Sequence, residues 1–237
     1  MACALAEGAV TRLRHEFKLV MSVEAAMALC ARLQAEAPAT RTEIVSVYFD
    51  GAGFPLTRRA LAMPRDCLKV RLKEYAPDLG SAEPRVVVEV KRERDGLTKK
   101  LRTWVAREEL GALYERGELW TRLPFSDTCG LTPVLAVSYL RDVYQLSESW
   151  RVTVDQRVSF HRVDPAAALG PRPLRATGLD APVSCADGVV VEVKHLDEAL
   201  PRWLGALRAE ATVAFSKFAT GMRQLGMTAA GLAASGG

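Results

Sequence analysis

The hexapeptide Val-Val-Val-Glu-Val-Lys occurs twice in the chain, at residues 86–91 and again at residues 189–194. Valine-rich runs predict β-strands, because branched side chains suit a pleated surface. Side chains alternate across a strand, so the glutamate and the lysine of each copy share one face and most of the valines cover the other. Two such strands, far apart in sequence, predict a sheet whose charged faces meet in space.

The size and composition of the chain indicate one soluble globular domain. It has 237 residues, of which 49% are hydrophobic and 25% charged, enough for a substantial core. No run approaches the roughly 20 apolar residues that span a bilayer, and residues 1–10 lack the pattern of a signal peptide. The five cysteines are scattered, without metal-binding spacing, which favours free thiols in the cytoplasm. We expect disorder in 1–11 and 228–237, and a single domain over 12–227.

Apolar–polar alternation and turn signals predict the remaining elements. Further strands are expected at 12–20, 43–50, 66–75, 97–105, 133–146 and 150–160, and helices at 22–37, 106–116, 197–210 and 216–225. Ser22 is expected to cap the first helix, whose predicted apolar stripe is Val23, Ala26, Met27, Cys30 and Leu33. Strand–strand connections dominate, so the expected fold is α+β, an antiparallel β-barrel of about eight strands with helices packed outside.

The polar faces of these strands carry an unusual set of side chains. They comprise Arg14, Glu16, Lys18, Lys69, Arg71, Lys73, Glu89, Lys91, Lys100, Arg102, Arg141, Arg151, Asp155, Glu192 and Lys194. A solvent-facing sheet surface accounts for any single strand, but an ordinary wet face would balance its charges, and here basic groups outnumber acidic ones by more than two to one. If the sheet closes, these faces line a charged tunnel that suits a polyanion such as a phosphate chain. The few carboxylates then suit a hard divalent metal.

The order of these motifs resembles a known family. The motifs are Arg14-His15-Glu16-Phe17-Lys18, Lys69-Val70-Arg71-Leu72-Lys73, Glu89-Val90-Lys91, Tyr139-Leu140-Arg141, Arg151-Val152-Thr153-Val154-Asp155, Glu192-Val193-Lys194 and Phe215-Ser216-Lys217-Phe218. Their succession resembles the VTC domain, the polyphosphate polymerase domain within the CYTH superfamily of triphosphate tunnel metalloenzymes. The resemblance runs from about residue 12 to residue 225.

The resemblance implies a tunnel enzyme that transfers the γ-phosphate of ATP to a growing polyphosphate chain, with Mn²⁺ or Mg²⁺ as cofactor. ATP, pyrophosphate and polyphosphate are the implied partners, without nucleic acid. The implied catalytic residues are Lys18, Arg71, Lys91, Arg141 and Arg151. The implied substrate-binding residues are Lys69, Lys73, Lys99, Lys100, Tyr139, Lys194, Ser216 and Lys217, with Lys99 and Lys100 as alternatives for one position. The best metal candidate is Glu192, followed by Glu89 and Glu16.

Two departures from the family limit what the resemblance implies. Arg14 replaces an acidic residue of the superfamily's opening motif, which suits the polymerase branch better than the hydrolase branch. The regulatory SPX domain and the membrane helices of the eukaryotic complex have no counterpart in the sequence, so neither regulation by inositol pyrophosphates nor membrane channelling carries over. A membrane-protein partner on another chain stays open.

Two other functions remain as alternatives to the polymerase. One is a tunnel hydrolase that cleaves inorganic triphosphate or a related compound, and the other is a polyphosphate- or nucleotide-binding module without turnover. The sequence has no Walker-type loop, which argues against a P-loop kinase. The three histidines and the cysteines lack a paired base signal, so neither is expected to act in catalysis.

Overall fold

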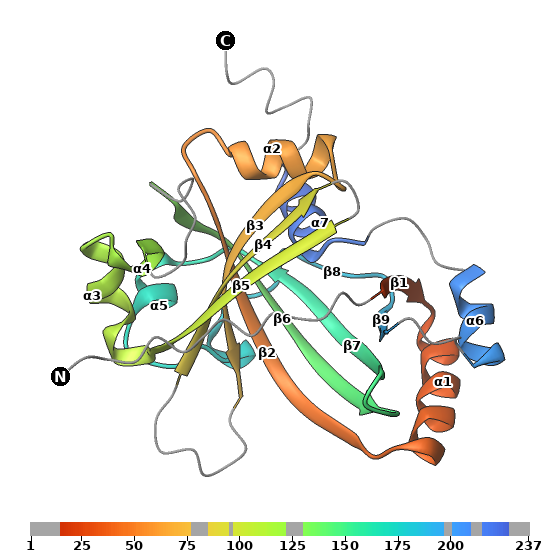
Figure 1. The fold of residues 1–237 in the computed structure, drawn as a ribbon. Helices are drawn as coiled ribbons and strands as arrows, with labels where there is room; N and C mark the ends of the chain where they lie inside the picture. The colour runs from red at the N-terminus through yellow and green to blue at the C-terminus, as the bar shows by residue number, and fades with distance from the viewer. Residues whose placement is uncertain are drawn as a thin grey trace.

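A computed structural model describes residues 15–76, 85–94, 97–121, 130–196, 201–209 and 215–227. The predictions for both termini, and the position of Arg14, lie outside these residues. The fold is one curled antiparallel sheet with helices around it (Figure 1). The strands are β1 His15–Met21, β2 Ala39–Asp50, β3 Cys67–Tyr75, β4 Arg85–Arg94, β5 Leu97–Ala106, β6 Thr132–Gln145, β7 Trp150–His161, β8 Ser184–Cys185 and β9 Val189–His195.

The sheet follows the order β1-β9-β7-β6-β2-β3-β4-β5, and the short β8 pairs with β7. The two valine-rich repeats are β4 and β9, near opposite ends of this order. The prediction of about eight antiparallel strands is therefore confirmed. Among the described residues the sheet is a half-barrel rather than a closed barrel, because its two end strands, β1 and β5, do not pair with each other. Glu16 on β1 nevertheless lies 4.0 Å from Lys91 on β4, so the charged faces of the two halves do meet.

Helices cover the convex face of the sheet and close one part of the concave face. They are α1 Val23–Glu36, α2 Pro55–Ala62, α3 Leu110–Glu115, α4 Glu118–Thr121, α5 Pro165–Leu169, α6 Arg202–Ala209 and α7 Lys217–Gln224, with 3₁₀ turns at Arg107–Glu109 and Ala176–Gly178. In Figure 1, α1 and α6 lie beside β1 and β9, α3 to α5 lie on the other side, and α2 and α7 lie together. Among the described residues, no helix is long and apolar enough to cross a membrane.

The core on the convex face has two parts. Val86, Val88 and Val90 of β4 pack with the outer side chains of β2 and β3 and with α3, α4 and α5, as the alternation predicts. The second part joins β1, β7 and β9 to α1 and α6. The valine-rich strands β4 and β9 therefore bury their apolar sides outward against helices, which leaves their charged sides on the concave face.

Some local predictions were wrong. Ser22 caps α1 through a hydrogen bond from the Ala25 amide (3.1 Å), but Val23 and Met27 are exposed, and Leu29 packs in the core in their place. Ala26, Cys30 and Leu33 of the predicted stripe do pack in the core, so the prediction was wrong only for Val23, Met27 and the omitted Leu29. The sequence also gave no signal for α2, α4 or α5.

A β-bulge in β7 overturns one consequence of strict alternation, which would place Arg157 on the same face as Arg151 and Asp155. The register against β6 shifts between Ser138 and Leu140, and Arg157 on the opposite strand takes a left-handed φ of 52°. An extra residue reverses the alternation beyond it. Asp155 therefore faces the concave side and Arg157 faces solvent, whereas Val158 and Phe160 turn inward and join an apolar cluster.

That inner apolar cluster seats α7 against the concave face. Phe218 and Met222 of α7 pack with side chains of β2, β6 and β7. The helix approaches closely at Gly221, where an added Cβ would lie 2.6 Å from a Leu135 methyl and 2.8 Å from the Phe160 ring. Glycine is thus required at position 221 because a larger side chain would not fit, and not because of its backbone conformation. Its small size allows α7 to lie close to the sheet.

Replacing Gly221 with alanine is expected to lower the free energy of unfolding by about 1–3 kcal/mol, because overpacking forces side chains and backbone to shift. Chemical denaturation measures the change. Gly205 offers a matched control, since it lies in helix α6 with nothing within 4 Å of an added Cβ. Gly205→Ala should be neutral or stabilising, and an equally neutral Gly221→Ala would contradict the close packing of α7.

Candidate phosphate-binding lumen

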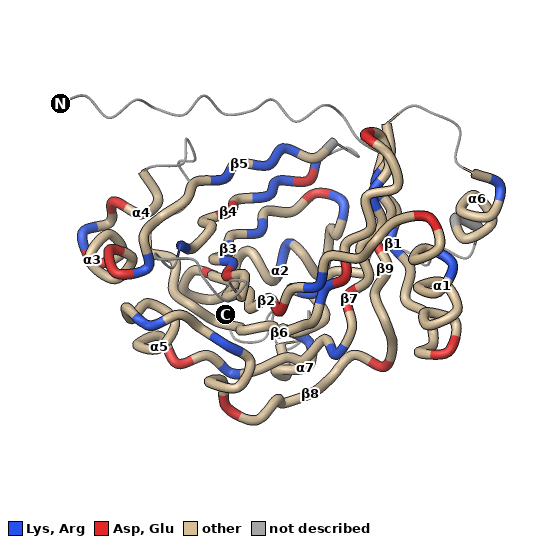
Figure 2. Tube along the Cα trace, turned by 90° about the horizontal axis from the view of Figure 1, so that it is seen from below, with Lys and Arg blue, Asp and Glu red and all other residues tan. Residues whose placement is uncertain are grey.

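The charged side chains of β3, β4 and β5 stand in rows across the concave face, which we call the lumen. The strand register places Lys69 opposite Lys91, and Lys91 opposite Lys100. The next inward-facing row is Arg71, Glu89 and Arg102. Figure 2 shows the basic positions of β3, β4 and β5 gathered on neighbouring strands of the curled sheet. Alternation within each strand and antiparallel register are sufficient to build this array.

Glu89 is the counter-ion at the centre of these rows. Its carboxylate accepts from Arg71 at 2.5 Å and from Arg102 at 2.7 Å, and lies 3.1 Å from the Lys100 ammonium. The side chain is almost fully buried. Burial alone would raise the pKa of Glu89, but the three cations hold it well below its ordinary value. Glu89 therefore stays ionised and compensates part of the basic charge.

A second buried carboxylate, Asp155, organises the opposite side of the lumen. Arg141 contacts it through two nitrogens, at 2.5 and 2.7 Å, and the Lys217 ammonium lies 2.5 Å from it. Burial opposes ionisation, yet Lys217 and Arg141 lower the pKa of Asp155 to about 2. Both cations also lie over the Tyr139 ring, at 5.3 Å for Arg141 and 4.7 Å for Lys217. The tyrosine thus supports two cations that β6 and α7 bring together.

Glu16 and Glu192 form a third acidic group, between β1 and β9. The antiparallel register pairs Glu16 with Lys194, and Lys18 with Glu192. Lys18 lies 2.7 Å from Glu16 and 3.9 Å from Glu192, and Lys194 lies 3.6 and 2.8 Å from the same two carboxylates. Burial would raise the pKa of Glu192, but Lys194 and Lys18 hold it well below its ordinary value.

These two carboxylates are a pair that could hold a metal ion. A small hard cation such as Mg²⁺ is commonly held by one or two carboxylates, with phosphate oxygens and water completing its coordination. Glu16 and Glu192 meet that need together. Glu89 is engaged instead by Arg71, Lys100 and Arg102 on the neighbouring strands, and no group of three metal-ligating side chains occurs among the described residues. A metal here would therefore share its coordination with a bound phosphate chain.

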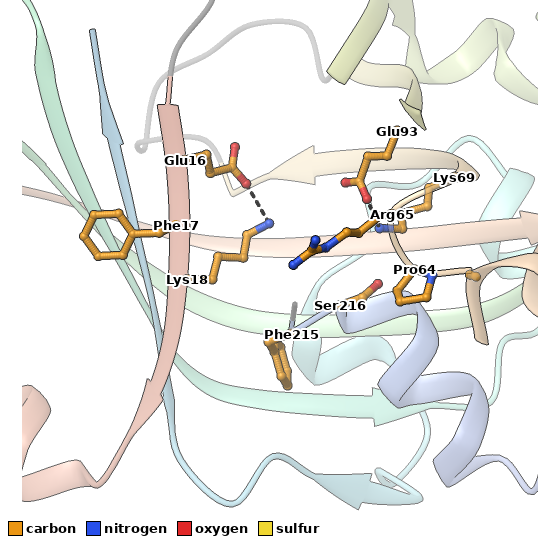
Figure 3. Close-up of a pocket in the computed structure, with 10 residues that line it drawn as sticks. Glu16, Phe17, Lys18, Pro64, Arg65, Lys69, Glu93, Phe215 and Ser216 are labelled. Atoms are coloured by element: carbon orange, nitrogen blue, oxygen red, sulfur yellow. Dashed lines mark hydrogen bonds and ion pairs between the residues drawn. The ribbon is translucent and has the colours of Figure 1, made fainter. Parts of the chain in front are cut away.

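A pocket of about 280 Å³ opens at one end of the lumen. Lys18, Lys69 and Glu93 line it from the sheet, and Arg65 and Ser216 line it from the segments before β3 and α7. Figure 3 shows Lys18 and Arg65 reaching into it from opposite sides. Glu93 pairs with Lys91 at 2.5 Å and Lys69 at 3.3 Å, and Lys69 and Lys91 together lower its pKa to about 2 although burial would raise it.

The structure gathers most of the predicted site residues on one face. Those with side chains on the lumen are Glu16, Lys18, Lys69, Arg71, Lys73, Glu89, Lys91, Lys100, Tyr139, Arg141, Arg151, Glu192, Lys194 and Lys217. Lys99 is the exception: it is exposed and pairs with Arg92 on the opposite face, so Lys100 is the member of that alternative that fits. The Ser216 hydroxyl accepts from the Ala219 amide at 3.4 Å and caps α7 beside the pocket.

Sequence reasoning missed two charged residues of the pocket. Glu93 lies two positions after Lys91 on the same strand face, so continued alternation along β4 would have found it. Arg65 lies in the turn between α2 and β3, where no periodic pattern indicates which way a side chain points. Lys73 was among the predicted substrate-binding residues. It is buried, and it forms no ion pair with any of the described residues. Burial lowers the pKa of Lys73 well below its ordinary value, as do Arg141 and Arg71.

The fold is a curled antiparallel sheet whose concave face is lined with cations. The family model of the VTC domain matches residues 12–226 of this chain. The chain therefore belongs to the VTC domain family, and the resemblance seen in the motifs is confirmed.

The comparison with solved structures gives one protein of similar fold and two others with lower TM-scores. HpAC1 from Hippeastrum, a protein with a dominant triphosphatase activity, shares 16% identity with a TM-score of 0.50, covering 89% of this chain and 96% of its own. The PH1819 protein of Pyrococcus horikoshii OT3 shares 16% identity with a TM-score of 0.47, covering 86% and 94%. The capping enzyme triphosphatase of Mimivirus shares 7% identity with a TM-score of 0.38, covering 82% and 85%. A search of curated proteins found no match.

Lys100 should make stability depend on pH. Burial lowers its pKa to about 7 from an ordinary 10.5, and Arg71, Arg102 and Lys194 act in the same direction against Glu89. Between these values the unfolded chain binds more protons, so stability rises with pH. From pH 7 to pH 9, wild type should gain about 1–2 kcal/mol in free energy of unfolding relative to Lys100→Met, after allowance for solvent screening.

Urea denaturation of both proteins at the two pH values measures this gain. Lys99→Met is the matched control, because Lys99 is its exposed neighbour on the other face. The control should follow wild type in parallel. If the stability of Lys100→Met also rose in parallel with that of wild type, the Lys100 side chain would not be desolvated and surrounded by cations in the folded protein.

Proposed function

We propose that this chain is a metal-dependent phosphotransferase of the polyphosphate polymerase type, which transfers the γ-phosphate of ATP to a growing polyphosphate chain in the lumen. The observation that carries the proposal is the excess of inward-facing cations over buried carboxylates. Cations on β1, β3, β4, β5, β6, β9 and α7 share one concave face. Polyanionic phosphate would relieve their mutual repulsion.

The arrangement suits phosphoryl transfer by positioning. Arg71 and Arg141 present planar guanidinium groups, which contact phosphate oxygens in pairs. Each is held by a buried carboxylate, Glu89 for Arg71 and Asp155 for Arg141, so its orientation is fixed before substrate binds. Preorganised cations around a transferring phosphoryl group stabilise its developing charge without reorganisation. The attacking group is itself a phosphate oxygen, which needs little activation by a base.

Mn²⁺ or Mg²⁺ would be held by Glu192 and Glu16. Such an ion neutralises charge on the phosphate oxygens that it contacts. Lys18 and Lys194, which now bridge the two carboxylates, can turn toward phosphate when a metal takes their place. This exchange couples metal binding to substrate binding, because each lysine released from a carboxylate gains a phosphate partner.

Hydrolysis of triphosphates is the second candidate. The likeness of fold to a protein with triphosphatase activity favours it, and the same lumen could serve water as the acceptor in place of phosphate. A binding module without turnover is the third. The three differ in what becomes of the γ-phosphate of ATP, which makes them separable in one experiment.

Phosphorus NMR of the purified protein with Mg²⁺, ATP and a little pyrophosphate tests the proposal, and a parallel incubation with Mn²⁺ uses product separation instead, since Mn²⁺ broadens phosphorus signals. Growth of an internal-phosphate signal together with ADP is the expected result. Orthophosphate released from ATP or from added tripolyphosphate, without internal phosphate, would establish the hydrolase instead. An unchanged spectrum, from a protein that binds tripolyphosphate by calorimetry, would leave only the binding module.

A further inference from the structure

The lumen changes its chemistry along β3, β4 and β5. The row that follows Arg71, Glu89 and Arg102 consists of Lys73, Val87 and Trp104. Tyr75 continues the inward face of β3 beyond it. One end of the lumen is therefore cationic and the other end is aromatic. Rows are about 7 Å apart, since alternate residues of a strand share a face.

Trp104 is unusually exposed for an aromatic side chain on the inward side of the sheet. It keeps 53% of its surface accessible, although the indole lies on the inward side of β5, next to the cation rows. The Tyr75 ring lies 6.3 Å from it at an interplanar angle of 34°. Beneath them, the buried Lys73 ammonium lies 4.6 Å from the centre of the Tyr75 ring. The result is an aromatic surface, open on one side, that borders a phosphate-binding array.

We propose that Trp104 and Tyr75 form a platform on which the base of a nucleoside triphosphate stacks while its phosphates lie on the cation rows. This inference rests on the proposed function and adds how the nucleotide is oriented. Stacking on aromatic side chains tolerates any base, because each base presents a π-face. The succession from aromatic ring to cation along one strand face matches the succession from base to triphosphate in the ligand.

The platform also gives the lumen a direction. Tyr75 and Lys69 lie near opposite ends of β3, and Lys69 lines the 280 Å³ pocket with Lys18 and Arg65. A nucleotide whose base lies on Trp104 points its terminal phosphate toward that pocket. The pocket is then left for the second anion, the phosphate chain that accepts the transferred group. Donor and acceptor would meet between the Arg71 row and Lys18.

Isothermal calorimetry of the full chain with ATP and with inorganic tripolyphosphate, without added metal, tests the platform. Trp104→Leu should weaken ATP binding about tenfold, since a stacked base contributes to affinity by roughly this factor or more. Its affinity for tripolyphosphate should change less than about twofold, because this ligand has no base. Trp104→Phe should keep most of the ATP affinity. Met27→Ala is the matched control, since it removes an exposed apolar side chain from α1, away from the lumen.

The outcomes separate this inference from the proposed function. Unchanged ATP affinity in Trp104→Leu would overturn the platform, and so would an equal loss for ATP and tripolyphosphate, which would assign Trp104 to the fold of the lumen. Either result leaves the proposed function standing as long as wild type binds tripolyphosphate. A wild-type protein that binds neither anion, with or without added Mg²⁺, would overturn the proposed function itself.

Discussion

Replacing Arg107 with methionine is expected to lower the free energy of unfolding by about 3–5 kcal/mol, because it strands a buried carboxylate. Arg107 is almost fully buried, and its guanidinium lies 3.1 Å from Glu74 of β3. It also donates at 2.9 Å to the backbone carbonyls of Ala167, Ala168 and Arg172. One side chain thus joins the segment around α5 to β3 and to the turn after β5. Urea denaturation at pH 7 measures the loss.

The chain offers a matched control and a rescue for this prediction. Arg116 pairs with Glu118 at 2.9 Å, but both are about half exposed, so Arg116→Met should change stability little, because solvent screens the pair. Adding Glu74→Leu to Arg107→Met removes the stranded charge and should recover part of the loss. A double variant no more stable than Arg107→Met alone would show that the backbone carbonyls, and not Glu74, account for the role of Arg107.

The lumen could be predicted from sequence because side chains alternate between the two faces of a strand, with a period of two residues. Within β3, β4 and β9, alternation alone places Arg71, Glu89 and Glu192 on one face and the valines on the other. Side chains standing on one face of several antiparallel neighbours must be close, whatever the exact register. The two identical repeats carried this signal most clearly. Glu16 of β1 links their charged faces, since it lies 4.0 Å from Lys91 of β4 and 3.6 Å from Lys194 of β9.

What sequence could not supply depends on departures from that period or on tertiary contact. The left-handed residue Arg157 reverses the alternation in β7, and neither arginine nor its neighbours are typical of such a conformation. Arg107 follows a strand and looks like an ordinary surface arginine, since only the fold brings the carbonyls around α5 to it. Arg65 and Trp104 could not be assigned to the site from sequence, because they lie at the ends of the lumen and those ends exist only once the sheet has curled.

Changing Glu192 to glutamine is expected to separate binding from turnover. Glu192 is buried and contacts Lys194 at 2.8 Å and Lys18 at 3.9 Å, so an uncharged amide releases part of the hold on both ammonium groups. Tripolyphosphate should then bind as tightly as in wild type or more tightly. Turnover of ATP with Mn²⁺ should fall about a hundredfold or more, as when a preorganised charge at the transferring group is lost. Calorimetry and phosphate-product assays give the two quantities.

The opposite direction of the two effects makes this variant decisive about the metal assignment. A merely structural role for Glu192 would reduce affinity and turnover together, and a lower unfolding temperature would accompany both. Glu109→Gln, which removes an exposed carboxylate from the 3₁₀ turn after β5, should change neither. Electron paramagnetic resonance of Mn²⁺ adds a readout that needs no activity, since Glu192→Gln should weaken retention of the ion whereas Glu89→Gln should not. Full turnover in Glu192→Gln would show that Glu192 of β9 does not hold the metal. Of the two carboxylates assigned to the metal, Glu16 would then remain.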